Sequence, residues 1–407
     1  MQESENTITL LLVLIVSCIA NNVGAQGYNT RRADLRLTSF GPNEMASIGN
    51  CIPRSFSSIE IEFELDVASS RIQALGFLST EELIVLTRSN ELISYDIKND
   101  VKYRFPTLNG LFADIGPIIE GEFLLLGNRY FDEEHDIERS VVCYDNQGNL
   151  LWDIENIIMG RAPIFYDGKY YFASDRYMVN NSINEINPSG VFPLLIIDPG
   201  DTWYPELIAG EDSLIWYGIA AGPLIVNIED EGELTLSDFE SDIEGVMNLI
   251  HDAADRIALL DFDTHELVVI DKETATTSTI NYLHELGLQE QHPLTSWGKN
   301  YLASTGEKIV ILFENKLITY EDTRLRLWHD SLNKLVSRFE PTCLYIDEAG
   351  DHFIIANALS KEIIYGGEDV RAIQFDGIRT TPITFSEDFK YAAFGTRTGK
   401  IYILELH

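Results

Sequence analysis

The chain has 407 residues with 65 acidic and 29 basic side chains, so its formal net charge is −36 at pH 7. Such a charge repels nucleic-acid phosphates and anionic lipids, which excludes binding to either of them through charge. Apolar residues make up 45% of the chain, which is enough for a packed core and excludes global disorder.

The N-terminus carries a pattern typical of an export signal. Residues 8–20 are apolar over a length that suits a signal peptide and is too short to span a bilayer comfortably. The small residues 23–25 then predict a cleavage site, although the first seven residues contain two glutamates and no Lys or Arg. Residues 1–25 therefore predict an extracytoplasmic protein, either secreted or periplasmic.

Two alternatives to simple cleavage stay open. Residues 15–18 resemble a bacterial lipobox, in which Cys18 would be lipidated and would provide the only contact with a membrane. The other alternative is an N-terminal helix that remains on the chain.

The chain after the signal begins with a polar stretch and one strand. Residues 26–57 are mixed and polar, and we interpret them as an N-terminal extension. Residues 58–66 alternate strictly between apolar and acidic side chains, which predicts a half-buried strand with one solvated face.

Residues 58–407 repeat one motif about every 40 to 50 residues, a spacing typical of repeat folds. Short apolar runs alternate with turns of Gly, Asp, Asn or Glu, which predicts an all-β protein with a single β-propeller domain. The first strands of eight copies begin near Ile72, Asp114, Pro163, Tyr204, Met247, His292, Cys343 and Pro382. Second strands are predicted at 82–87, 122–126, 170–174, 213–217, 256–260, 301–304, 352–356 and 391–395. Third strands are predicted at 92–97, 141–145, 224–228, 267–271, 309–313, 363–365 and 401–406.

A count of seven blades is the alternative to eight. The third copy has a weak third strand at 182–186, and residues 325–339 do not read clearly as β-structure. We interpret 325–339 as an insertion or a short helix. A β-helix is the alternative fold, but its repeats are shorter and lack this grouping into four runs.

The two chain ends predict how the propeller closes. The chain stops directly after the third strand of the last copy, at 401–406, so that copy lacks a fourth strand. The unassigned strand at 58–66 would supply it and would leave no exposed sheet edge between the first and last copies.

The cysteines do not predict a complete disulfide set. Without Cys18, three remain, and Cys143 lies in an apolar strand where a buried thiol is usual. Cys51 and Cys343 could pair only if the N-terminus packs near the seventh copy. No CxxC motif or Cys/His cluster is present, so we predict no metal site.

Motifs for catalysis are weak. The segment 395–400 is one residue short of a phosphate loop and joins two strands, so a hairpin turn is the better interpretation. The acidic segments 132–136 and 261–266 are interpreted as solvated turns, because they lack the pattern of an EF-hand loop. His251, beside Asp252, and His292 lie near inner strands, where a His–Asp pair could serve acid–base chemistry or be ordinary loop residues. No GxSxG motif is present and no cofactor is predicted.

Two copies resemble known propeller families. Residues 385–406 resemble a WD40-like blade, although the Gly-His and Trp-Asp signatures are missing. Residues 141–152 resemble a blade of pyrroloquinoline-quinone-like propellers, with an Asp and Gly turn before Leu-Trp. The export signal, the possible lipobox, the repeat number and the length together resemble the plan of BamB-type outer-membrane assembly lipoproteins. That resemblance implies a protein partner in the cell envelope.

The prediction for function is a rigid, non-catalytic scaffold that binds a protein partner. In a propeller, the loops that lead from an outer strand into the next inner strand gather at one end, where they are fixed yet solvated. The residues predicted to line the binding face are Arg161, Asp201, Trp203, Tyr204, Gln291, His292 and Arg379. The alternative is an extracellular enzyme or binding protein that acts on a polysaccharide or other glycan through the propeller funnel. An enzyme would show a deep funnel with converging acids of shifted pKa, whereas a scaffold would show a flatter apolar patch.

Overall fold

The computed structural model describes residues 51–407, with gaps between and within the sheets. The positions outside the description are 1–50, 69, 106–111, 120, 131–136, 158–162, 175–180, 198–202, 210–212, 220, 229–233, 237–248, 254–255, 262–263, 272–273, 275, 290–301, 306, 314, 333–341 and 358–360. The predicted signal segment and Cys18 lie outside the described residues.

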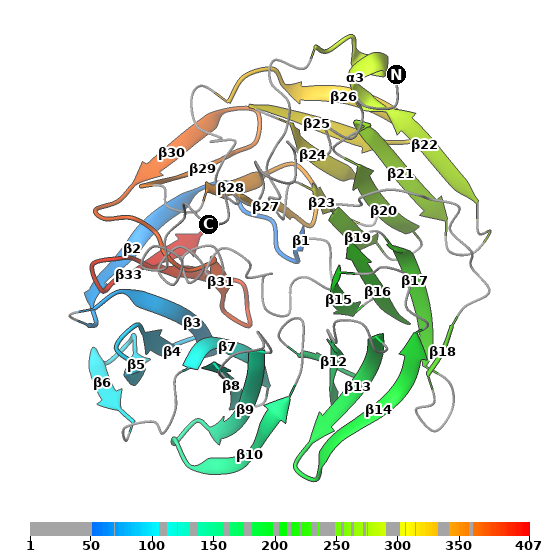
Figure 1. The fold of residues 1–407 in the computed structure, drawn as a ribbon. Coiled ribbons are helices and arrows are strands. Elements are labelled where there is room, and N and C mark those ends of the chain that lie inside the picture. The colour runs from blue at the N-terminus through cyan, green and yellow to red at the C-terminus, as the bar shows by residue number, and fades with distance from the viewer. Residues whose placement is uncertain are drawn as a thin grey trace, which may run out of the picture. The chain divides into compact units, whose positions relative to one another are not determined.

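The described residues form eight sheets, which we number in chain order of their first strands (Figure 1). Sheets 1 to 7 each contain four consecutive antiparallel strands joined as hairpins. Sheets 1 to 4 comprise β3 (Ile72–Ser79), β4 (Glu82–Thr87), β5 (Leu92–Asp96) and β6 (Val101–Arg104); β7 (Phe112–Ile119), β8 (Glu122–Tyr130), β9 (Ile137–Asp145) and β10 (Leu150–Ile157); β11 (Ile164–Tyr166), β12 (Lys169–Ser174), β13 (Asn181–Asn187) and β14 (Gly190–Ile197); and β15 (Trp203–Ala209), β16 (Ser213–Ile219), β17 (Ala221–Ile228) and β18 (Leu234–Leu236).

The second half of the chain continues this order up to an exception in the last sheet. Sheets 5 to 8 comprise β19 (Leu249–Ala253), β20 (Arg256–Asp261), β21 (Glu266–Asp271) and β22 (Thr277–Asn281); β23 (Leu302–Ser304), β24 (Ile309–Phe313), β25 (Lys316–Glu321) and β26 (Arg324–His329); β27 (Thr342–Asp347), β28 (Phe353–Asn357), β29 (Glu362–Gly366) and β30 (Val370–Gln374); and β31 (Thr384–Phe385), β32 (Tyr391–Gly395) and β33 (Lys400–Leu406). The all-β class is confirmed.

Burial follows the position of a strand within its sheet. Several middle strands are buried on both faces, as Leu83 to Leu86 of β4 and all of β24 are. Two of the fourth strands show the opposite pattern, because β6 is exposed along its whole length and β30 at four of its five residues. A sheet that buries both faces of its middle strands must pack against neighbouring sheets.

The apolar core lies between neighbouring sheets. One cluster joins β32 and β33 of sheet 8 to β3 and β4 of sheet 1, and another joins sheets 1 and 2 around Phe105 and Phe123. The first strands of neighbouring sheets also contact one another, as β3 does with β7 and β23 does with β27. The first strands are therefore the inner strands.

Every sheet has two distinct ends. At the hairpin end, the first strand turns into the second and the third turns into the fourth. At the connection end, the second strand turns into the third, and the chain passes from a fourth strand into the next first strand. This distinction places every loop of the repeat on one end or the other.

The strand predicted at 58–66 is present and pairs with the last strand. It forms β2 (Ile59–Asp66), antiparallel to β33, with Ile59 opposite Leu406 and Asp66 opposite Lys400. The backbone N–H of Ser57 donates to the carbonyl oxygen of His407 at 2.5 Å. Sheet 8 thus takes its outermost strand from the N-terminal side of the chain, as expected.

A second N-terminal strand was not predicted. Residues Cys51–Ile52 form β1, which pairs in parallel with β27 on the free edge of that inner strand. Cys51, Ile52 and Phe56 are buried. The last part of the segment interpreted as an extension therefore belongs to the packed structure of sheets 7 and 8.

The weak third strand predicted at 182–186 is confirmed, because these residues lie inside β13, the third strand of sheet 3, where Ile183 and Ile186 are buried. The interpretation of 325–339 as an insertion or a short helix was wrong for its first residues. Residues 324–329 form the strand β26 rather than an insertion or helix; their exposed polar pattern is that of an outer strand.

The sixth copy was shifted by one strand. Its described first strand is β23 (Leu302–Ser304), which had been predicted as a second strand, whereas His292 lies outside the described residues. β23 has only three residues, and so short an apolar run gives a weak sequence signal.

The described cysteines Cys51, Cys143 and Cys343 are buried and free. The N-terminus does pack near the seventh sheet, because β1 pairs with the strand that carries Cys343. Cys51 lies opposite Ile346, however, so the two cysteines are offset by three positions along the ladder. That offset is too long for a disulfide.

The helix content of the described residues is small. The short helix α3 spans Tyr282–Leu286. Asn281 caps its N-terminus, because the Asn281 side chain accepts from the His284 N–H, and Gly287 caps its C-terminus with a φ of 61°. None of the helices within the described ranges has the length and apolarity needed to cross a membrane.

Several third strands end in an aspartate that organises the following hairpin turn. The carboxylate of Asp145 accepts from the backbone N–H groups of Gln147 and Asn149 and from the Asn149 side chain, at 2.7 to 2.9 Å. Asp96 accepts in the same way from the backbone and side chain of Asn99. These hydrogen bonds to the charged form lower the pKa of both carboxyl groups below 3.8.

The turn aspartates predict a dependence of stability on pH. A carboxyl group with a lowered folded pKa stabilises the fold above its unfolded pKa, and this contribution is lost as pH falls through the folded pKa. We expect Asp145→Asn to be less stable than the parent at pH 7, with a difference that shrinks below about pH 4. Urea unfolding between pH 7 and 3 tests this. The control is Glu60→Gln, which removes one charge from the exposed strand β2 outside any turn. An equal loss of stability at pH 7 in both variants would contradict the prediction.

Candidate functional site

Three of the seven predicted binding residues, Trp203, Tyr204 and Arg379, lie within the described part of the chain, at the connection end of their sheets. Trp203 and Tyr204 begin β15, the first strand of sheet 4. Arg379 lies in the connection from β30 into β31. Arg161, Asp201, Gln291 and His292 lie outside the described residues. The role of all seven residues in binding stays a prediction.

Arg379 differs from expectation in its exposure, because its side chain is only 3% accessible. Its guanidinium donates Nη1–H to the carbonyl oxygen of Thr381, and Nη2–H to that of Ala356 in β28 at 3.1 Å. Arg379 therefore links sheets 7 and 8 from within. Sequence reasoning placed it in the right loop but could not show that the guanidinium turns inward.

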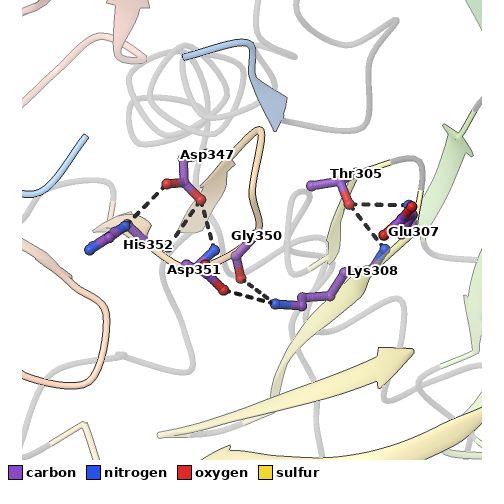
Figure 2. Close-up of polar contacts among 7 residues, drawn as sticks. All are labelled: Thr305, Glu307, Lys308, Asp347, Gly350, Asp351 and His352. Atoms are coloured by element: carbon purple, nitrogen blue, oxygen red, sulfur yellow. Dashed lines mark hydrogen bonds and ion pairs between the residues drawn. The ribbon is translucent and has the colours of Figure 1, made fainter. Parts of the chain in front are cut away.

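A polar cluster occupies the hairpin end of sheets 6 and 7 (Figure 2). Asp347 ends β27 and is fully buried. Its Oδ1 accepts from the backbone N–H groups of Asp351 and His352 at 2.8 and 3.0 Å, and its Oδ2 lies 3.1 Å from His352 Nδ1. From the neighbouring hairpin, Lys308 donates to the carbonyl oxygen of Gly350 at 2.8 Å and pairs with Asp351 at 3.3 Å.

The Asp347–His352 pair has the arrangement of a carboxylate that orients an imidazole. Such a pair activates a nucleophile only if a hydroxyl or thiol lies within hydrogen-bond reach of the second ring nitrogen. The His352 ring instead lies beside Phe56, with ring centroids 5.6 Å apart, and beside the backbone of Gly367. This placement gives the pair a structural role in the turn between β27 and β28.

The buried thiols are poor nucleophiles. Burial, reinforced by the charges of Asp347 and Glu348, raises the pKa of Cys51 to about 12. Burial beside Glu122 raises the pKa of Cys143 to about 12 as well. Both shifts disfavour the reactive thiolate. Across the described residues, no group of three or more His, Cys, Asp or Glu side chains is arranged to hold a metal ion.

The segment 395–400 is a turn between β32 and β33, as interpreted from the sequence. Its backbone N–H groups are engaged within the fold, since Arg397 N–H donates to Ile378 O and Lys400 N–H donates to the Thr396 hydroxyl. Gly399, at a φ of 87°, packs so closely on Ala68 that a Cβ there would lie 2.0 Å from a carbonyl oxygen. The loop is not a phosphate cradle.

No family model matches the sequence, and no curated protein sequence matches it. Among solved structures, the chain is similar to BamB from Moraxella catarrhalis, with a TM-score of 0.55 and 9% identity over 86% of this chain and 100% of that one. It is similar to the computationally designed protein Ika8, with a TM-score of 0.54 and 11% identity over 84% of this chain and 98% of that one. The WD40 β-propeller domain of Doa1 matches with a TM-score of 0.48 and 9% identity over 86% and 98% of the two chains.

The protein is a β-propeller. In this propeller, β1 adds to the free edge of an inner strand, so residues 51–52 lie on the inner side of sheet 7. Residues 51–52 thus occupy part of the inner side of sheet 7.

One feature of the propeller escaped sequence reasoning. The Asp347–His352 pair was missed in favour of His251 and His292. A strand that ends in Asp, with Gly three residues later, is the signal that could have located the turn.

Proposed function

We propose that this β-propeller is an exported, non-catalytic scaffold that holds a protein partner on its connection end. The observation that carries the proposal is that the polar side chains at the hairpin end are used within the turns, as Asp96, Asp145 and Asp347 are. We therefore expect the partner on the connection end, where Trp203 and Tyr204 begin the inner strand β15.

The proposal accords with the similarity to BamB, which is a likeness of fold. Export rests on the predicted signal in residues 1–25. Binding anchors are expected among Trp203 and Tyr204, because aromatic side chains at the edge of a rigid frame bury large areas at low entropic cost.

Site-specific photo-crosslinking in the native host tests the proposal. A photoreactive residue at Tyr204, near the start of β15 on the connection end, is expected to give a discrete adduct with one partner protein. The same residue at Asn99 or Ser189, both exposed in hairpin turns, is the matched control and should give none. Adducts from the hairpin positions alone would place the partner on the other end and contradict the proposal.

A second measurement separates binding from folding. We expect Trp203→Ala to weaken partner binding by about 2 kcal/mol or more, with little change in melting temperature. A large fall in melting temperature would instead identify Trp203 as a core residue.

A further inference from the structure

The strands β1 and β2 belong to one N-terminal segment, residues 51–66, which we call the arm. The arm completes sheets 7 and 8, whose other strands come from the C-terminal part of the chain (Figure 1). β1 lies parallel to β27, and β2 lies antiparallel to β33. We call these two strand edges the acceptor edges. Residues 67–71, the hinge, connect the arm to the first strand of sheet 1.

The apolar contacts of the arm are made with the sheets that it completes. Phe63 and Leu65 pack where sheet 8 meets sheet 1, and Lys102 of sheet 1 contacts the carbonyl oxygen of Asp66. Three further side chains of the arm are buried in one cluster with residues of sheets 7 and 8; they are Ile52, Phe56 and Ile59. The same contacts form when the arm and the acceptor edges belong to two different molecules.

Polar contacts fix the register of β2 on its acceptor edge. His407 donates its N–H to the carbonyl oxygen of Ser58 at 2.9 Å, and its own carbonyl oxygen accepts from the Ser58 N–H at 3.3 Å. Near the other end of the ladder, the ammonium group of Lys400 contacts the carboxylate of Glu64. The acceptor edge of β33 therefore recognises one segment in one register.

The hinge between the arm and sheet 1 is short and bent back onto sheet 8. Val67 and Ala68 both donate their N–H groups to the carbonyl oxygen of Gly399 at 3.2 Å. Fully extended, the hinge reaches at most about 17 Å, so it carries the arm to another molecule only when these hydrogen bonds open. Short hinges favour the exchange of the segment that they carry.

The acceptor edges are distant from the arm in sequence. Ser57 and its partner His407 are 350 residues apart. Because loop closure over such a length is slow, the arm and the acceptor edges stay open while the sheets between them form. In that interval the arm of one copy meets the acceptor edges of another copy, which offer the same partners.

We propose that two copies of the chain exchange their arms when they fold together at high concentration, so that the arm of each copy completes sheets 7 and 8 of the other. The exchanged dimer keeps the contacts of the monomer, so the two states differ in the hinge and in the entropy of association. The net charge of −36 opposes the approach of two copies, and salt screens this repulsion. The exchange leaves the connection end free and goes beyond the proposed function.

Two single variants of the full chain, Glu60→Cys and Glu405→Cys, test the proposal when they are mixed. The two positions lie opposite each other in the β2–β33 ladder. Opposite residues of antiparallel strands have Cα atoms about 4.5–5.5 Å apart, which suits a disulfide. The variants are unfolded together in urea, refolded at about 0.15 M salt and oxidised with glutathione disulfide. Because each variant carries only one of the two substitutions, only an exchanged dimer brings both positions together in the ladder.

We expect a covalent dimer linked between positions 60 and 405, which non-reducing electrophoresis and mass spectrometry of the linked peptides identify. While the dimer is the minor species, its ratio to monomer should rise about tenfold for a tenfold increase in chain concentration, because association follows mass action. The collision control is Glu60→Cys mixed with Glu387→Cys, because Glu387 is exposed in the turn between β31 and β32, away from the ladder.

Each outcome decides the proposal. A dimer linked between positions 60 and 405 that is no more abundant than the dimer of the collision control would overturn it. If either variant melts below the parent, Asp66→Cys mixed with Lys400→Cys, an opposite pair at the other end of the ladder, takes its place under the same criterion. The crosslinks from Tyr204 test the connection end separately, so the loss of one proposal leaves the other standing.

Discussion

A chain that begins at Ile72 is expected to aggregate or to lose most of its stability. The truncation removes β1 and β2 and exposes the edges of β27 and β33. It also removes four buried apolar side chains, each worth about 1.5–3 kcal/mol when fully buried. They are Ile52, Phe56, Ile59 and Val67. Their combined loss is comparable with the whole stability of a typical domain, about 5–15 kcal/mol.

Thermal melting and light scattering of two further truncations provide the controls. A chain that begins at residue 50 keeps both strands and should melt like the full chain. A chain that begins at residue 58 keeps β2 and should show an intermediate loss. If the chain from Ile72 stays monomeric with unchanged melting, the prediction of a closed propeller fails.

Replacement of Arg379 by Met is expected to lower the free energy of unfolding by about 2–6 kcal/mol. Methionine keeps an apolar stem but donates no hydrogen bonds, so the carbonyl oxygens of Thr381 and Ala356 lose a donor. Each buried polar group left unsatisfied costs about 1–3 kcal/mol. Urea unfolding measures the difference.

Arg371→Met is the matched control, because Arg371 is exposed on the outer strand β30. Its substitution should change stability by no more than about 0.5 kcal/mol. Unchanged stability of Arg379→Met would show that the two carbonyl contacts do not hold sheets 7 and 8 together.

The middle strands were predictable because their apolar runs end at turn residues. The predicted strands at 82–87 and 391–395 agree with β4 and β32 at both ends. The sixth copy failed because its first strand has three residues, too few for a distinct pattern. The two-residue β1 was invisible for the same reason, since only its partner β27 defines it as a strand.

The candidate site was less predictable than the fold. Repeat position placed Arg379 in a connecting loop, but the direction of its guanidinium depends on the carbonyl oxygens of Thr381, in the same loop, and of Ala356, in sheet 7. The contact of sheet 8 with sheet 1 depends on residues about 300 positions apart in the chain, such as Thr380 with Ile72. A local pattern in one sequence carries no information about such contacts.

The use of N-terminal strands to complete the last two sheets has a consequence for biosynthesis. β1 and β2 are among the first segments made, yet their partners β27 and β33 lie at the far end of the chain. At roughly 5–20 residues per second, the early strands wait for some tens of seconds with unpaired edges and apolar side chains in solvent. Because loop closure over such a separation is slow, we expect the pairing of β1 with β27 and of β2 with β33 to be the last step of folding. Newly made chains should therefore depend on chaperones until translation is complete.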